Sequence, residues 1–96
     1  MTSKYGELFS LKDKVVFVAG GSGAIGGEMA RGAAEYGAKV VIAGRKAEAA
    51  AAIATELQEM GADAMSIKLD VTEEDSILSA FEAVKETLGA VDVLIN

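Results

Sequence analysis

The chain has 96 residues, 51% of them apolar and 25% charged, and its 15 acidic and 9 basic side chains give a net charge of −6. This length allows one domain, and the negative charge argues against general affinity for nucleic acid or an anionic membrane, while leaving room for a local phosphate site. No apolar run approaches the roughly 20 residues of a membrane span. The absence of cysteine excludes disulfides and thiolate metal sites, and the absence of histidine removes the commonest general base. We therefore predict a cytoplasmic protein without a metal site.

The first predicted elements are a buried strand, a glycine loop and a helix. Residues Lys14–Ala19 (KVVFVA) are apolar and β-branched without polar alternation, which is typical of a strand buried on both faces. The glycine loop Gly20–Gly26 follows it directly. Apolar side chains then recur at helical spacing and predict a helix over roughly 25–36, through Ile25, Met29, Ala33 and Tyr36.

A second strand, helix and strand follow. Lys39–Ala43 (KVVIA) has the character of a buried strand. Ala47–Met60 is rich in alanine and glutamate and predicts a helix with one apolar face, formed by Ile53, Leu57 and Met60. Ala64–Leu69 predicts the third strand.

The last predicted elements are a third helix and a fourth strand. Thr72 is expected to cap the helix, because three acidic residues follow it and acidic residues favour a first turn. The buried face of this helix is marked by Ile77, Phe81, Val84 and Leu88. Val91–Ile95 predicts the fourth strand.

A recurring Gly-Ala pair ends each predicted helix and supports this assignment. Glycine directly after a helix commonly forms its left-handed cap, and a strand follows within about two residues each time. Repeated strand–helix alternation implies right-handed crossovers and a parallel sheet. We therefore predict an α/β, doubly wound, Rossmann-type sheet of order 3-2-1-4 with helices on both faces. The pairs are Gly37–Ala38, Gly61–Ala62 and Gly89–Ala90.

The sequence predicts one partial domain over residues 1–96, incomplete at its C-terminal side. It closes on a strand of the buried type, which leaves a sheet edge and a face unfinished and indicates a fragment of a longer protein. Residues 1–12 are interpreted as a surface leader. Its apolar side chains Leu8, Phe9 and Leu11 are expected to pack against the domain.

The glycine loop is the first candidate site. Glycine at this turn lets the backbone approach a diphosphate, and the helix N-terminus offers free N–H groups and a positive dipole end. Gly20, Gly23 and Gly26 are spaced G-x-x-G-x-x-G rather than the better-known G-x-G-x-x-G. Such a loop also occurs as a plain tight turn packed on its sheet. The strand before it and the helix after it favour a pyrophosphate site for NADP or NAD.

The ends of the second and third strands carry further candidates. Arg45 and Lys46 follow the second strand, where NAD-selective sites have an acid that binds the ribose 2′-hydroxyl. Guanidinium and ammonium groups suit a 2′-phosphate, so we predict NADP in preference to NAD; the alternative is that these cations only end a strand and begin a solvated helix. Asp70 is either an acceptor for the adenine amino group or a turn- or helix-capping aspartate ahead of Thr72.

Together these segments resemble the short-chain dehydrogenase/reductase family, from about Phe9 to Asn96. Two loop positions depart from that family: Ala19 stands where threonine is usual, and Ala24 where the middle glycine is usual, with Gly23 one residue earlier as in the extended branch. The matching segments are Leu11–Val15 with the lead-in to the first strand, Ala19–Gly26 with the T-G-x-x-x-G-x-G loop, Leu69–Thr72 with the D-V adenine contact, and Asp92–Asn96 (DVLIN) with the start of D-x-L-x-N-N-A-G.

The resemblance implies roles for individual residues. Arg45 would lie by the adenosine 2′ position and Asp70 with Val71 by the adenine, and Asn96 corresponds to the first asparagine of its motif. The family's catalytic serine and its Tyr-x-x-x-Lys pair belong to later segments and have no counterpart here, so we assign no catalytic residue. Backbone contacts to the cofactor's phosphates and ribose would come from Gly20, Gly21, Ser22, Gly23 and Ile25.

We predict that this chain is the cofactor-binding part of an NADP-preferring dehydrogenase/reductase, which transfers hydride between nicotinamide and a carbonyl compound or secondary alcohol. The complete protein is expected to form a homo-oligomer. One alternative is an NAD-dependent sugar-nucleotide epimerase or dehydratase, which the glycine spacing suggests and the Asp70–Val71 and DVLIN segments oppose. Another is a nucleotide-binding module without catalysis, either a redox sensor or a truncated remnant. Downstream residues would discriminate between them.

Overall fold

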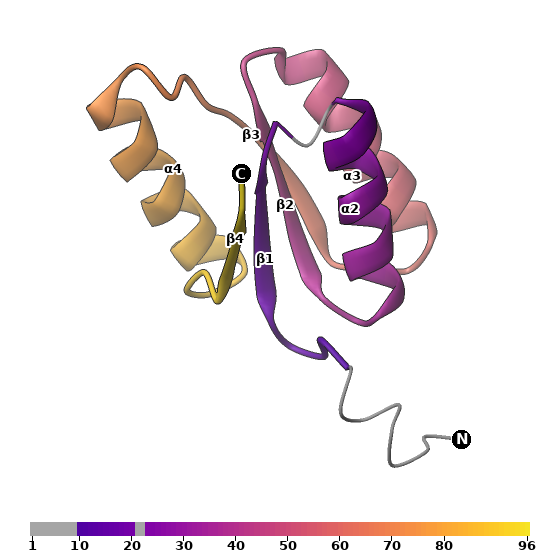
Figure 1. Ribbon diagram of the computed structural model, residues 1–96. Coiled ribbons are helices and arrows are strands. Elements are labelled where there is room, and N and C mark those ends of the chain that lie inside the picture. Colours follow the sequence, from indigo (N-terminus) through magenta and orange to yellow (C-terminus); the bar gives the residue numbers. More distant parts are fainter. Residues whose placement is uncertain (1–9, 21–22) are drawn as a thin grey trace.

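The computed structural model describes residues 10–20 and 23–96, in which strands and helices alternate (Figure 1). Every predicted element is confirmed, with bounds within two residues of the expected ones. The elements are β1 (Val15–Ala19), α2 (Ala24–Glu35), β2 (Lys39–Gly44), α3 (Ala47–Glu59), β3 (Ala64–Lys68), α4 (Glu74–Thr87) and β4 (Val93–Ile95).

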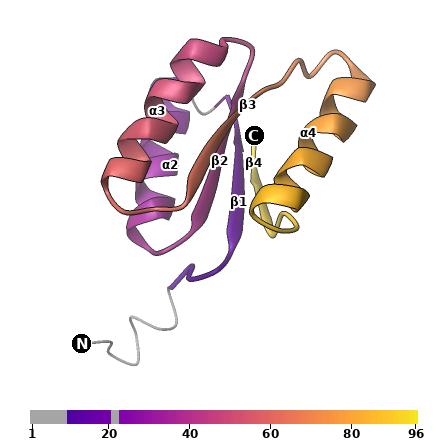
Figure 2. The same ribbon diagram turned by 180° about the vertical axis from the view of Figure 1, so that it is seen from behind.

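The sheet is parallel and has the order β3-β2-β1-β4, as predicted. In register, Val16 of β1 pairs with Val40 of β2 on one side and with Val93 of β4 on the other. Helices α2 and α3 cover one face and α4 covers the other (Figures 1 and 2). All strands run in one direction, so their carboxyl ends meet at one edge of the sheet, which is the upper edge in Figure 1.

The core has two layers because alternate side chains of a strand point to opposite faces. Val16 and Val18 pack with α2 and α3, whereas Val15 and Phe17 pack with α4. The Phe17 ring stacks on Phe81 of α4, with ring centroids 4.8 Å apart. Leu11 packs against the first layer, as predicted; Leu8 and Phe9 lie outside the described residues.

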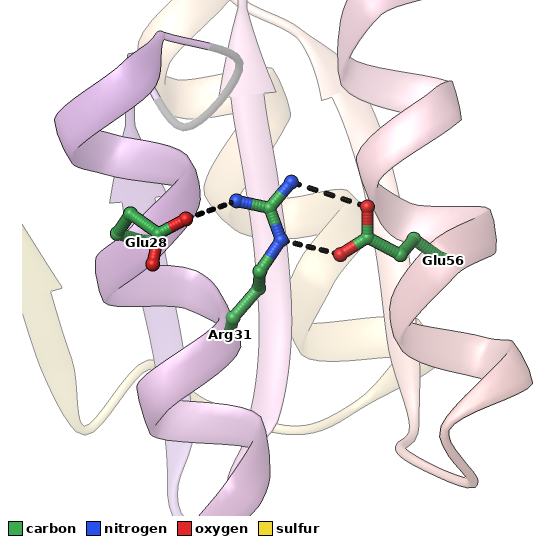
Figure 3. Close-up of polar contacts among 3 residues, drawn as sticks. All are labelled: Glu28, Arg31 and Glu56. Carbon is green, nitrogen blue, oxygen red and sulfur yellow. Dashed lines mark hydrogen bonds and ion pairs between the residues drawn. The ribbon is translucent and has the colours of Figure 1, made fainter.

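Helix α2 forms where predicted, but most of the side chains that marked it face solvent. Ile25 is 79% exposed, and Met29 and Tyr36 are also exposed. The face toward the sheet is formed by small residues, Gly27, Ala30 and Ala33. Small residues allow close packing of a helix on a sheet, and a search for large apolar side chains overlooks them. Arg31 of α2 forms ion pairs with Glu28 and with Glu56 of α3 (Figure 3).

The turns at the amino edge of the sheet follow the predicted pattern. Gly37, Gly61 and Gly89 each end a helix with positive φ, at 94°, 93° and 113°. Asp92, just before β4, accepts a hydrogen bond from the Val15 N–H at 2.9 Å, and its own N–H donates to the Val15 carbonyl. These contacts join the start of β4 to the start of β1.

Strand β4 is less buried than the sequence indicates. Val93 and Leu94 are 38% and 57% exposed, although their composition predicts a buried strand. The physical reason is position: in the described part of the chain β4 pairs only with β1 and lies at the edge of the sheet.

Candidate nucleotide-binding site

A cleft of about 260 Å³ lies at the carboxyl ends of the strands, where open α/β sheets bind their ligands. Its lining includes the last residues of β1 and β2 and residues that follow all four strands. Four residues predicted from the sequence come together there, although they lie far apart along the chain: Gly20 after β1, Arg45 after β2, Val71 after β3 and Asn96 after β4.

An apolar hollow of about 290 Å³ continues this cleft along the α4 face. Ile77 and Phe81 of α4 line it together with Leu94 of β4. The two spaces share Ala19, Leu69, Val71 and Asn96. The combined cleft therefore has a cationic end at Arg45 and an apolar end at Phe81.

A separate hollow of about 350 Å³ lies at the opposite edge of the sheet and does not suit a nucleotide. Its lining includes the carboxylates of Asp13, Glu35 and Asp63 with the single cation Lys39. Acidic groups repel phosphate, and this edge holds the amino ends of the strands. We therefore place the candidate site at the carboxyl edge.

The glycine loop is held to the sheet by backbone hydrogen bonds. The Gly20 N–H donates to the Ala43 carbonyl at 2.7 Å, and the Gly20 carbonyl accepts from the Gly23 N–H at 3.0 Å. Gly20 has φ +78°, a conformation that favours glycine. Gly21 and Ser22, which are also predicted to bind the cofactor, lie outside the described residues.

The N-terminus of α2 is open to an anion. Its N-cap is Gly23, which has no side chain to cap the helix, and its first turn, which includes Ile25 and Gly26, contains no acidic residue. The first turns of α3 and α4 do contain acids: Glu48 in α3, and Glu74 with Asp75 in α4. Free first-turn N–H groups and the helix dipole suit a phosphate at this position.

Asp70 lies in the turn after β3 and interacts closely with Thr72. Its Oδ1 accepts hydrogen bonds from the Thr72 hydroxyl at 2.6 Å and from the Thr72 N–H at 3.0 Å. The hydroxyl bond above all, then the backbone bond, lowers the pKa of Asp70; burial opposes this, and the charges of Arg45 and Lys68 add to it. Asp70 is therefore an ionised acceptor, and its neighbours in the chain, Leu69 and Val71, line the cleft.

The structure corrects the role expected for Thr72. The N-cap of α4 is Glu73, with no side-chain capping bond, and the helix begins at Glu74. Thr72 lies one residue before this N-cap, and its hydroxyl donates to the Asp70 carboxylate. The turn role considered for Asp70 is thus present. The Asp70 N–H also donates to the Ser76 hydroxyl at 3.2 Å, a contact that the sequence does not predict.

The family model described as short chain dehydrogenase matches residues 14–96. The chain belongs to that family. The predicted resemblance is confirmed, and the matches do not favour the sugar-nucleotide epimerase alternative.

Members of the short-chain dehydrogenase family provide close matches. Gluconate 5-dehydrogenase of Gluconobacter oxydans is 37% identical over 90 residues, which cover 94% of this chain and 35% of that protein. A short-chain type dehydrogenase/reductase from Mycobacterium marinum is 33% identical with a TM-score of 0.87, over 92% of this chain and 36% of that one. The chain therefore spans about a third of the length of these relatives.

A more distant structure supports the fold alone. A protein from Haemophilus influenza, whose structure holds bound NAD, is 23% identical with a TM-score of 0.87, over 95% of this chain and 32% of that one.

In residues 10–20 and 23–96 of the present chain, no helix has both the length and the apolar character that crossing a membrane requires.

Proposed function

We propose that this chain is the cofactor-binding portion of an NADP(H)-preferring short-chain dehydrogenase/reductase. The observation that carries the proposal is the convergence of Gly20, Arg45, Val71 and Asn96 on one cleft at the carboxyl edge of the sheet. Family membership supports an oxidoreductase. The complete protein would transfer hydride between nicotinamide and a small carbonyl compound or secondary alcohol, and would form a homo-oligomer.

The glycine loop and the α2 N-terminus would hold the pyrophosphate. Gly20 and Gly23 bring backbone close to the cleft without side chains, and the first-turn N–H groups at Ile25 and Gly26 would donate to phosphate oxygens. Gly21 and Ser22 belong to the same predicted loop. When bound, the nicotinamide ring would supply the hydride chemistry, and this chain would supply binding and orientation.

The adenosine half would lie toward the ends of β2 and β3. Arg45 is exposed and lines the cleft directly after β2, with Lys46 beside it and no acid to bind a ribose 2′-hydroxyl. A guanidinium group there would pair with a 2′-phosphate. Val71 would contact the adenine ring, and Asp70 would accept from its amino group. Asn96 would contact the cofactor from the end of β4.

Titration of the protein with NADPH and with NADH, followed by fluorescence, tests the cofactor preference. Hydrogen bonds to charged groups contribute about 1.5–3 kcal/mol, so Arg45→Ala should weaken NADPH binding by roughly tenfold or more. NADH binding should stay within about twofold. Lys85→Ala is the matched control, since it removes one positive charge from the last turn of α4 instead.

Tighter binding of NADH than of NADPH to the wild type would contradict the preference. Unchanged NADPH affinity in Arg45→Ala would contradict the role of Arg45. An equal loss in Lys85→Ala would show a net-charge effect rather than a contact. Hydride transfer itself is tested by following NADPH absorbance with a panel of carbonyl compounds; binding without turnover by the complete protein would indicate a non-catalytic module.

A further inference from the structure

The turn that carries Asp70 fixes both its backbone and its side chain. The Asp70 N–H donates to the Ser76 hydroxyl of α4 at 3.2 Å, and the Asp70 carbonyl accepts from the Glu73 N–H at 3.1 Å. Separately, the carboxylate accepts from both donors of Thr72 through a single oxygen, Oδ1. The backbone is therefore held independently of the Thr72 side chain.

Among residues 10–20 and 23–96, one carboxylate oxygen of Asp70 has no hydrogen-bond partner. Both Thr72 donors bind Oδ1, and in the described part of the chain no hydrogen bond to Oδ2 is present. An ionised carboxylate accepts hydrogen bonds at both oxygens and donates none. Asp70 is half-buried and stands between Leu69 and Val71, which both line the cleft. The charge of Arg45, which lines the cleft, acts on this carboxylate, and Thr72 fixes its orientation through Oδ1.

We propose that Thr72 is a positioning residue of the nucleotide site: by binding one oxygen of Asp70 it fixes the carboxylate and leaves the other oxygen to accept the adenine amino group. This inference rests on the proposed function and extends it to a residue that does not itself touch the nucleotide. A carboxylate ordered before binding loses less side-chain entropy when the ligand arrives. Thr72 therefore contributes to affinity through Asp70.

The test compares NADPH with its hypoxanthine analogue, in which a carbonyl group replaces the adenine amino group. Thr72→Val keeps the backbone donor and removes the hydroxyl, and should weaken NADPH binding by about threefold to tenfold, the range of one lost hydrogen bond. Binding of the analogue should stay within about twofold, because the analogue has no amino group for Asp70 to accept from. Thr72→Ser retains a hydroxyl and should restore NADPH affinity.

Thr87 offers a matched control for loss of a threonine hydroxyl. Its hydroxyl donates to the Ala83 carbonyl at 2.9 Å near the end of α4, away from the cleft. Thr87→Val should leave both affinities unchanged. In an Asp70→Ala background, Thr72→Val should have no further effect on NADPH binding, since the residue through which it acts is absent.

A purely structural role for Thr72 would give a different result. Equal weakening of NADPH and its analogue in Thr72→Val, or no weakening of either while the wild type binds NADPH, would overturn the inference and leave the proposed function intact. Additive losses in the double variant would also overturn it. Failure of the wild type to bind either dinucleotide would overturn the proposed function, and this inference with it.

Discussion

Glycine permits turns at the amino edge of the sheet and at Gly20 of the carboxyl edge, but Gly23 at the carboxyl edge differs from these. At the amino edge, Gly37, Gly61 and Gly89 end helices with positive φ, so the conformation itself favours glycine. At the carboxyl edge, Gly23 has φ −78° and ψ 169°, which any residue adopts. A Cβ there would lie 3.4 Å from the Gly20 carbonyl oxygen, at the open N-terminus of α2. This is an ordinary contact distance, so neither the backbone conformation nor the neighbouring protein atoms require glycine at Gly23, whereas the phosphate proposed at this helix N-terminus would require the space.

The hollows at the two edges also differ in charge. The amino edge gathers the carboxylates of Asp13, Glu35 and Asp63 around its hollow. The carboxyl edge has Arg45 in its cleft and a helix N-terminus without acids. In a chain of net charge −6, a local cationic region is informative because it departs from the average. The cleft at the carboxyl edge therefore has the features of an anion site, and the hollow at the amino edge does not.

The largest expected effect is at the amino edge. Gly37→Val should destabilise the protein by about 3 kcal/mol, because a β-branched residue is strained at φ +94° and its Cβ would already touch the Lys12 backbone. For a domain of this size the melting temperature should fall by more than about 10 °C. Gly61→Val introduces the same backbone strain, but its Cβ would meet no atom within 4 Å, so it should lower the free energy of unfolding by less. Equal losses would show that Lys12 plays no part.

The second prediction concerns Gly23 at the carboxyl edge, where a substitution should lower nucleotide affinity rather than stability. Gly23→Ala should weaken NADPH binding by about tenfold or more, since a methyl group would stand where phosphate approaches the helix N-terminus. Its melting temperature should change little, because alanine adopts this conformation readily. Gly32→Ala is the control within the same helix: it meets open space and should stabilise by about 1 kcal/mol without altering affinity. A large stability loss in Gly23→Ala would remove the distinction between the edges.

The third prediction concerns the side chain that joins β1 to β4. Asp92→Ala leaves the Val15 N–H, in a residue only 2% exposed, without its acceptor. Because Asp92 lies at the exposed sheet edge, the cost should be near the lower limit for an unpaired donor, about 1 kcal/mol of unfolding free energy. Asp92→Asn keeps an oxygen acceptor and should therefore retain most of the stability of the wild type. Chemical denaturation measures both, and nucleotide affinity should stay unchanged; equal losses would show that the hydrogen bond is not the cause.

Local sequence signals predicted the fold well. The β-branched runs KVVFVA and KVVIA identified β1 and β2, and the Gly-Ala pairs identified the turns between helices and strands. Strand order followed from the Rossmann-type pattern that repeated strand–helix alternation indicates, so it needed no knowledge of individual contacts. The convergence of Gly20, Arg45, Val71 and Asn96 was foreseeable because parallel strands share a carboxyl edge.

Features that depend on tertiary contacts were not predictable in this way. The small residues on the buried face of α2 give no strong hydropathy signal. The sequence pattern instead marks Ile25 and Met29, whose side chains are exposed in the structure. Asp92 and Val15 are 77 positions apart, a distance at which periodicity carries no information. The exposure of Leu94 depends on what else pairs with β4, which is a property of the whole sheet.

The smallest expected effect lies between the two edges, at the Arg31 cluster (Figure 3). The hydrogen bond from Arg31 lowers the pKa of Glu56, opposed by burial. Because the folded pKa lies below the ordinary value, the ion pair stabilises the fold above that value and is lost as pH falls through the folded pKa. Exposed pairs contribute little and are screened by salt. The melting temperature of Glu56→Gln should therefore be slightly below that of the wild type at neutral pH.

That difference in melting temperature should shrink in acid and in molar salt, whereas Glu82→Gln, an exposed change on α4, should show no comparable difference at any pH. A difference that grows in acid would contradict the sign of the pKa shift.

NADPH affinity is the more informative measurement, because the cluster links α2, whose N-terminus would hold phosphate, to α3, which begins beside Arg45. If the two edges act independently, the loss of this link leaves affinity unchanged. A weaker NADPH complex in Glu56→Gln would instead mean that α2–α3 pairing sets the geometry of the cleft.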